Sequence, residues 1–298
     1  MYWRPVELAC WSSVIKIHFL TFMKLLGFSD SGKRLHFVRD LTEQEKEMHR
    51  KSLPTWTDAR NKFHLFKLLG LNYSEWIAYI NILLTPTMRE EDIVVKLDRL
   101  LLNYLSCAYT IQEHFKGSIR RRFKNNTAKK EEYDTFIDEL CKKSWEYAFF
   151  LDFRGYVQHC GLGIGKFNRQ ANLTSVTVSI GQDAKELLEN SKEWKRCELT
   201  GKEGVLDLVK MLNEYHHRMT EQYGRFVAKL FYPELVQIAN FYSDLTREVQ
   251  QINLGFRMVF IENDPKINTE GDKQTMNLEL SFVPNDLFAE LGIMIPIK

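Results

Sequence analysis

Two residues of types that could do acid–base chemistry on a phosphate, Arg154 and His159, are separated by four residues in the run FRGYVQHCGLGIGK (153–166). Imidazole titrates near neutral pH, so His159 could act as a general base or a general acid. Guanidinium is a permanent planar cation whose N–H fork matches phosphate oxygens, so Arg154 could neutralise charge on a phosphate. The pair therefore has the groups needed to move protons and to stabilise an anionic transition state.

This chemistry fits cleavage of RNA by its own 2′-hydroxyl group, in which a base removes the hydroxyl proton, an acid protonates the 5′-oxygen and a cation stabilises the phosphate. DNA lacks the attacking hydroxyl, so the substrate would be RNA. One histidine does not easily serve as both acid and base. A homodimer in which two motifs meet across a two-fold axis would supply both groups in one composite cleft, with no metal and no cofactor.

The Arg-x4-His spacing resembles the motif of the HEPN (higher eukaryotes and prokaryotes nucleotide-binding) superfamily, helical bundles of which many are metal-independent ribonucleases. The likeness covers about residues 90–165, including the helical run LDFRGYVQHCGL. Gly155 stands where Asn or another polar residue often follows the arginine in that family. The resemblance implies a homodimeric endoribonuclease acting as a toxin or as an abortive-infection effector in antiviral defence against phage, with an antitoxin or a trigger protein as a further partner.

Seven further residues are candidates for substrate binding: Gln158, Tyr156, Asn103, His114, Arg120, Arg121 and Arg122. The two that neighbour the motif could orient a phosphate or a base, although a tyrosine more often packs. Asn103 and His114, together with Glu113, interrupt an apolar pattern and also fit a solvated helix face. The three arginines could hold the RNA backbone, but cations at a helix C-terminus are also favourable to the helix dipole.

The glycines of GLGIGK do not fit a nucleotide-binding loop. A P-loop has four residues between its first glycine and the Gly-Lys pair, and Gly161 is closer than that to Gly165. Phe167 stands where a P-loop has the hydroxyl that holds magnesium, and the segment follows a helix rather than a strand. We expect Gly161 instead to close the helix in the left-handed conformation.

Metal binding is not expected. His216 and His217 are adjacent, so on a helix they point about 100° apart and do not chelate one ion. The five cysteines lack a Cys-x-x-Cys pair, which excludes a zinc knuckle and a disulfide framework and favours a reducing cytosol: Cys10, Cys107, Cys141, Cys160 and Cys197. Cys160, beside His159, should be a small packing residue rather than a nucleophile.

Composition indicates a globular protein of cytoplasmic type. Apolar residues make up 44% of the 298 residues and charged residues 27%, and the net charge is only +2. These values exclude a disordered chain and a surface coated in basic patches. The longest uncharged stretches, near the N-terminus and at WIAYINILLTPTM (76–88), are shorter than the roughly 18 residues of a membrane span, so no membrane insertion is expected.

The sequence around the motif predicts a helical hairpin. Apolar residues recur at steps of three and four over about 30 residues: Ile93, Leu97, Leu100, Leu101, Tyr104, Leu105, Ala108, Ile111 and Phe115. This helix should end in RRRFKNNTAKK (120–130), and a second helix should run from about Lys130 to His159. Two long helices joined by a short loop form an antiparallel hairpin.

The remaining segments complete a mainly α prediction, a helical bundle with this hairpin and a small C-terminal β-sheet. The first 88 residues should be helical, with an amphipathic helix over 8–26 and a capping box from Thr42 to Glu45. Alternating runs at 175–180, 255–263 and 275–283 predict the strands of one sheet, between helical segments at 183–195, 202–231 and 233–253. The expected regions are residues 1–88 (helical), 89–168 (HEPN-like hairpin) and 169–298 (α+β).

A second class of function fits the same residues, a non-catalytic helical module whose hairpin dimerises and whose C-terminal sheet docks a protein partner. The surroundings of the motif separate the two classes. Catalysis is favoured if Arg154 and His159 point into a shared basic dimer cleft. The binding module is favoured if His159 is buried alone against apolar side chains.

Overall fold

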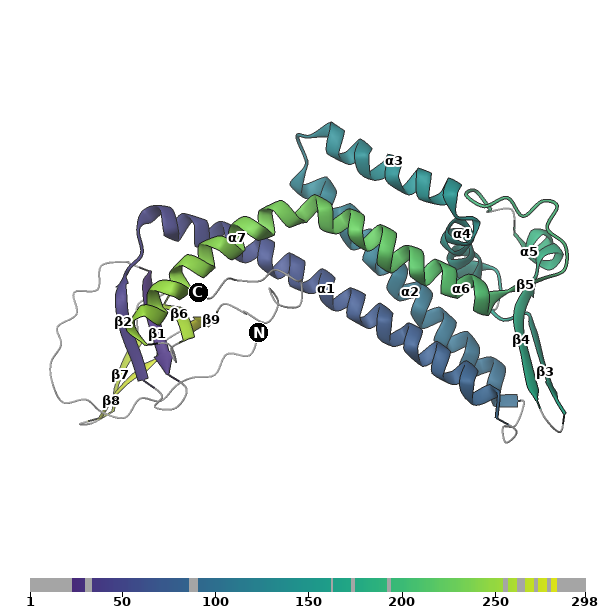
Figure 1. Ribbon diagram of the computed structural model, residues 1–298, viewed down its shortest axis with the longest axis horizontal. Helices are drawn as coiled ribbons and strands as arrows, with labels where there is room; N and C mark the ends of the chain where they lie inside the picture. Colours follow the sequence, from purple (N-terminus) through teal and green to yellow (C-terminus); the bar gives the residue numbers. More distant parts are fainter. Residues whose placement is uncertain are drawn as a thin grey trace. The chain divides into compact units, whose positions relative to one another are not determined.

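The computed structural model in Figure 1 describes residues 23–29, 34–85, 91–161, 163–172, 175–191, 194–253, 257–261, 266–270, 273–277 and 280–282. The helices are α1 (Glu43–Leu83), α2 (Glu91–Arg122), α3 (Thr127–Lys143), α4 (Trp145–His159), α5 (Ala184–Asn190), α6 (Leu208–His217) and α7 (Gly224–Ile252). A π-helical segment, η1 (Arg218–Tyr223), lies between α6 and α7. The predicted mainly α fold is confirmed. No helix in the described part of the chain is long and apolar enough to cross a membrane.

The strands form three antiparallel groups among the described residues. One sheet has the order β2-β1-β6-β9 and another the order β3-β4-β5, while β7 and β8 form a two-stranded hairpin. Their bounds are β1 (Lys24–Ser29), β2 (Arg34–Asp40), β3 (Lys166–Ala171), β4 (Val176–Asp183), β5 (Val205–Asp207), β6 (Arg257–Ile261), β7 (Lys266–Glu270), β8 (Lys273–Asn277) and β9 (Leu280–Phe282).

The chain divides into two compact units. Residues 59–230 form unit 2, and the described residues on either side of that segment form unit 1. This division differs from the three consecutive regions expected from the sequence. The reason is that β1 pairs with β6, so residues near both ends of the chain belong to one sheet.

Unit 1 corrects two predictions. The first 88 residues are not all helical, because β1 and β2 occupy part of them, and β1 replaces the end of the predicted helix 8–26, whose residues 8–22 lie outside the described residues. The consecutive residues Leu25 and Leu26 of β1 are both buried, so its centre reads as a continuous apolar run rather than an alternating one. The predicted capping box is confirmed: Glu45 accepts from the Thr42 backbone N–H at 2.8 Å, and Thr42 Oγ1 accepts from the Glu45 N–H at 3.3 Å.

Unit 2 contains the predicted hairpin. All nine apolar residues of the α2 stripe are buried, as the periodicity predicted. The second helix is divided at Ser144 into α3 and α4, which both contact α2. The Ser144 N–H donates to Leu140 O, closing α3, and its side chain accepts from Tyr147 N at 3.2 Å, capping α4. A serine side chain competes with the helical backbone in this way, which ends one helix and starts the next.

The sheet of unit 2 differs from the predicted one. The strand expected at 175–180 is present as β4, but it pairs with β3 and β5 rather than with the C-terminal strands. β6 pairs with β9 as the predicted C-terminal hairpin required, in the sheet of unit 1. The alternation located β4, β6 and the segment of β8 and β9, but it missed β1, β2, β3, β5 and β7. β5 falls within the segment 202–231 that was predicted to be helical, which corrects that prediction.

Candidate functional site

The helix α4 carries the motif, and one face of it is covered by residues 194–202. Trp145, Phe149, Asp152 and Tyr156 recur at helical spacing along this face. The Trp145 Nε1 donates to Glu198 O at 3.1 Å, and the Trp194 ring stacks on Phe149 and on Tyr156, each with centroids 5.7 Å apart. Tyr156 is buried here, so the packing interpretation of this residue is confirmed.

Asp152 fixes the covering segment to α4. Its buried carboxylate accepts from the backbone N–H of Arg196 at 2.5 Å and of Cys197 at 3.2 Å, and it pairs with Arg196 Nη1 at 3.0 Å. Three donors on one carboxylate satisfy most of its acceptor capacity and hold the loop backbone in a single position. The Cys197 thiol beside it is buried, and burial raises the pKa of this thiol to about 12, so it stays protonated at neutral pH.

Arg154 points to the other side of α4. It lies about 200° from Asp152 around a regular helix. Its guanidinium carbon lies 3.5 Å from the centroid of the Tyr109 ring of α2, a cation–π contact. Its Nε is buried without a hydrogen-bond partner, and no carboxylate pairs with it among the residues that the structure describes. Arg154 is therefore a cation held by an aromatic face, with its charge not neutralised inside the described chain.

His159 is the last residue of α4 and is exposed. It lies about 20° from Asp152 around the helix, on the face covered by residues 194–202, and about 140° from Arg154. Neither a hydrogen bond nor an ion pair involves its imidazole within the described part of the chain. The burial that would have favoured the binding module is not found. Within one chain, however, the two motif side chains leave α4 in different directions.

The other candidate residues lie on the surfaces of α4 and α2. Gln158 is exposed beside His159. Asn103, His114 and Glu113 are exposed on α2, as expected of a solvated face. The arginine cluster ends α2 at Arg120, Arg121 and Arg122, where Arg121 donates to Ser118 Oγ at 3.2 Å. Eleven positions of helix separate Arg120 from Tyr109, roughly 16 Å along the axis, so the cluster lies apart from Arg154.

The three glycines after His159 serve close packing. Gly161 is not in the left-handed conformation, which corrects the prediction; among the described glycines only Gly201 and Gly204 have positive φ. A Cβ at Gly161 would lie 2.6 Å from the Tyr156 Oη, and one at Gly163 would lie 2.8 Å from Leu101 Cδ2. At Gly165 a Cβ would collide with the Gln182 side chain.

The close approach lets side chains of unit 2 bond to the glycine segment. Asp98 Oδ1 accepts from the Ile164 N–H at 2.8 Å, and Gln182 Nε2 donates to Gly163 O at 2.8 Å. A carboxylate thus lies where a phosphate-binding loop would hold its anion. This arrangement agrees with the rejection of a nucleotide-binding loop.

Cys160 and His216 were the other two side chains that the sequence singled out. Cys160 is exposed, so it is not the packing residue that was expected. His216 stacks on Tyr73 with ring centroids 3.8 Å apart, and its Nδ1 lies 3.1 Å from the Tyr104 hydroxyl. Burial, with a smaller effect of His217, lowers the pKa of His216 to about 4. Within the described ranges no group of three or more His, Cys, Asp and Glu side chains could hold a metal ion.

Sequence reasoning missed Tyr109, Asp152, Trp194 and Arg196. Asp152 had a detectable signal, because an acidic residue within the aromatic run YAFFLDF (147–153) is unusual unless its charge has a buried partner. Tyr109 had none, since its partner Arg154 lies on another helix. No family model matches the chain, and the curated proteins and solved structures compared with it gave no match either.

Proposed function

We propose that the chain is a metal-independent endoribonuclease in which Arg154 and His159 act in a homodimeric cleft. The observation that carries the proposal is the state of the two side chains. The Arg154 guanidinium lies on the Tyr109 ring without a carboxylate partner, and the exposed His159 imidazole has no intramolecular partner in the described chain. A guanidinium without a carboxylate partner can bind a phosphate, and an exposed imidazole can accept a hydroxyl proton.

A dimer accounts for the directions of the two side chains. Because they leave α4 about 140° apart, the helix of one chain does not place both on a single phosphate from the same side. Two α4 ends related by a two-fold axis would bring two imidazoles and two guanidinium groups to one cleft. One His159 would then remove the 2′-hydroxyl proton while the other protonates the 5′-oxygen, and Arg154 would stabilise the phosphate.

A toxin or phage-defence role in the cytoplasm, with an antitoxin or trigger protein as partner, extends this proposal. Its support is the resemblance of the motif to HEPN ribonucleases. The chemistry stated above does not depend on it.

The test is cleavage of labelled total RNA and tRNA by the purified protein in EDTA, beside Arg154→Ala and His159→Ala. His64→Ala is the matched control, because His64 is also an exposed histidine of unit 2 but lies on α1 and is not a candidate residue. We expect cleavage by wild type and the control, products with 2′,3′-cyclic phosphate ends, and loss of cleavage in both motif variants. Light scattering of the same samples should give the mass of a dimer.

The contrary result would favour the non-catalytic binding module. If wild type leaves RNA intact, or if all variants cleave equally, the proposed site is wrong. One observation supports the module as the second candidate: Leu68, Leu71 and Ile82 of α1 are 50%, 61% and 43% exposed. Apolar side chains exposed along one helix are typical of surfaces that bind another protein.

A further inference from the structure

The turn between α2 and α3 concentrates positive charge. Between Glu113 and Glu131 the sequence has seven lysines and arginines and no acidic residue. The whole chain has a net charge of only +2, so this short segment is more positive than the protein as a whole. Figure 1 shows the turn at the end of α3 that lies away from α4. The Arg154 and His159 motif does not account for this charge.

Four of these cations have no carboxylate partner. Arg120 and Lys124 are exposed, and neither side chain forms a hydrogen bond or an ion pair within the described residues. Arg121 donates to Ser118 Oγ at 3.2 Å, and Lys130 Nζ donates to Lys124 O at 3.0 Å, so these two bond to neutral oxygens. We call Arg120, Arg121, Lys124 and Lys130 the hairpin tip. Its charges are not neutralised inside the described chain.

Two other lysines of the same segment do pair with carboxylates. Lys116 Nζ lies 3.9 Å from the Glu113 carboxylate, and Lys129 Nζ lies 2.6 Å from that of Glu132. The residues of the hairpin tip lack such pairs, although acidic side chains flank the segment. Their positive charge is therefore exposed to ligands from solution.

Helix stability accounts for only part of the hairpin tip. Arg120 and Arg121 end α2, where cations are favourable to the helix dipole. Lys130 lies in the first turn of α3, which has no acidic residue, and a cation is unfavourable there. Repulsion among these neighbouring cations also opposes folding. An anion bound between them would relieve both costs.

The surroundings of the hairpin tip favour a phosphate backbone over a membrane or a protein. No large apolar side chain of residues 110–131 is exposed. Helices that lie on a lipid surface insert apolar side chains, and protein interfaces are enriched in aromatic residues and depleted in lysine. Guanidinium groups, in contrast, bind phosphate oxygens with two parallel hydrogen bonds. A row of phosphates is the ligand whose chemistry fits these side chains.

The helix α2 places the hairpin tip on the same side as Arg154. The Arg154 guanidinium lies on the Tyr109 ring, and Tyr109 and Arg120 are eleven residues apart in α2. Eleven residues are three turns and about 20°, so these two residues share one helix face, roughly 16 Å apart along the axis. Between them on this face, Lys116 pairs with Glu113. A single RNA strand that contacts Arg154 can therefore continue along α2 to the hairpin tip.

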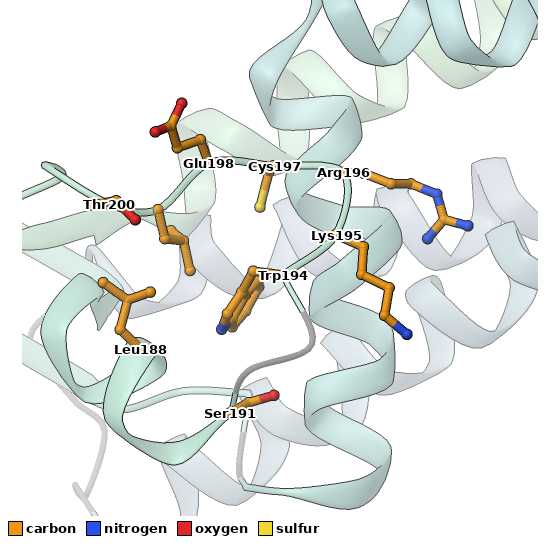
Figure 2. Close-up of a pocket in the computed structure, with 9 residues that line it drawn as sticks. Leu188, Ser191, Trp194, Lys195, Arg196, Cys197, Glu198 and Thr200 are labelled. Carbon is orange, nitrogen blue, oxygen red and sulfur yellow. The ribbon is translucent and has the colours of Figure 1, made fainter.

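A surface pocket over α4 lacks such cations. It has a volume of about 380 Å³ and includes Trp194 in its lining. Figure 2 shows the side chains of Lys195 and Arg196 extending away from the Trp194 ring, and Arg196 pairs with the buried Asp152. The charged groups at this pocket are therefore not directed at a ligand on the ring.

We propose that the hairpin tip binds the phosphate backbone of the RNA substrate and holds the strand that extends along α2 from Arg154. The inference rests on the proposed function, because the RNA is the substrate of the motif. It adds a binding site apart from the cleavage chemistry. Affinity at this site should not depend on base sequence, because contacts to phosphates do not read the bases.

The test is binding of a short, fluorescein-labelled, single-stranded 2′-O-methyl RNA to the full chain, followed by anisotropy over a range of salt concentrations. This RNA has no free 2′-hydroxyl and stays intact whether or not the protein is a nuclease. The double variant Arg120→Gln/Lys124→Gln should weaken binding about tenfold. Its slope of log Kd against log salt should be smaller by about 1.4, or about 0.7 for each lost contact to a single strand. Oligouridine and oligoadenosine should show the same change.

Lys142→Gln/Lys210→Gln is the matched control, because it removes the same charge from two exposed lysines of unit 2 that lie outside the hairpin tip, on α3 and α6. It should keep the Kd and the salt slope of wild type. Equal losses in the two double variants would overturn the inference, since net charge and not the hairpin tip would then attract the RNA.

The inference is also overturned if wild type does not bind the RNA, or if Arg120→Gln/Lys124→Gln, with unchanged circular dichroism, binds as tightly as wild type. Loss of binding to phosphatidylserine vesicles in this variant, with unchanged RNA binding, would assign the hairpin tip to a membrane instead. Weaker RNA binding by the variant, without any RNA cleavage by wild type, would retain the hairpin tip and reject the nuclease. Cleavage by wild type with RNA binding unchanged in the variant would do the reverse.

Discussion

The buried carboxylate of Asp98 on α2 accepts a hydrogen bond from the Ile164 backbone N–H at 2.8 Å, which ties the segment after His159 to the hairpin. Burial raises the pKa of Asp98, and hydrogen bonds from the backbone of Ile164 and Gly163 offset part of this rise. A carboxyl whose pKa is raised in the folded state prefers to be protonated there. Its charged form therefore makes folding less favourable.

Asp98→Asn should change how stability depends on pH. The folded wild type binds more protons than the unfolded chain between the ordinary aspartate pKa of about 3.9 and the raised pKa of Asp98, so wild-type stability falls as pH rises through this window. Asparagine keeps the acceptor for Ile164 and removes this dependence. In urea unfolding, the free energy of unfolding of the variant should rise relative to that of wild type as pH increases through the window. Above the window the difference between the two proteins should be constant. Asp134→Asn, at an exposed position of α3, is the control, and a difference that does not vary with pH would contradict the prediction.

Gly155→Ala and Gly161→Ala should have opposite effects on stability. A Cβ at Gly155 meets nothing within 4 Å, so alanine should raise the free energy of unfolding by about 1 kcal/mol through its higher helix propensity. A Cβ at Gly161 would lie 2.6 Å from Tyr156 Oη, and Tyr156 is fixed by stacking on Phe153 and Trp194. Overpacking of this kind lowers stability by about 1–3 kcal/mol. Thermal unfolding of the two variants measures both effects, and equal shifts would show that the packing at Gly161 adjusts freely.

Tyr109 should position Arg154 through its ring and not through its hydroxyl. Under the proposed nuclease function, Tyr109→Phe keeps the cation–π contact and should cleave RNA within about twofold of wild type, whereas Tyr109→Leu should lose about tenfold. The loss should be in kcat if the guanidinium stabilises the transition state. An NMR readout is independent of activity: the Arg154 Nε–H resonance should lose its ring-current shift in Tyr109→Leu alone. An unchanged resonance would mean that the ring does not hold the guanidinium.

Acid should weaken unit 1 through Glu45. Hydrogen bonds from Arg39, assisted by Thr42, lower the pKa of Glu45 to about 2. A carboxyl with a lowered pKa adds stability above its unfolded pKa of about 4.3, and this contribution disappears as pH falls towards 2. Glu45→Gln should lower the free energy of unfolding at neutral pH. Between the unfolded and the folded pKa of Glu45, this variant should lose less stability on acidification than wild type does. Glu47→Gln, which removes the exposed pairs with Arg50 and Lys51, should change stability by less than about 0.5 kcal/mol. Equal acid sensitivity of wild type and Glu45→Gln would contradict the assignment.

Local patterns predicted the parts of this fold that depend on neighbouring residues. The α2 stripe from Ile93 to Phe115 repeats often enough to define a helix and its buried face. The Thr42–Glu45 capping box spans four residues and depends on little else. β4 was visible from its alternation, because one short strand already shows period two.

Contacts between distant residues could not be predicted in this way. The pairing of β1 with β6 joins segments from opposite parts of the sequence, and no local pattern encodes it. The break at Ser144 depends on a single hydrogen bond, in which the Ser144 hydroxyl rather than water accepts from the Tyr147 N–H. In the candidate site, the motif residues and their helix were predictable, while the ring beside Arg154 and the segment that covers α4 come from other elements.

The pairing of β1 with β6 also sets an order of events during synthesis of the chain. A ribosome releases β1 before α1, but β1 has only β2 as a partner until β6 emerges. Residues 59–230 are complete by then and can fold as soon as they leave the exit tunnel. The nascent chain therefore carries the open edge of β1 for most of its translation, a period in which a holdase chaperone that covers strand edges would protect it.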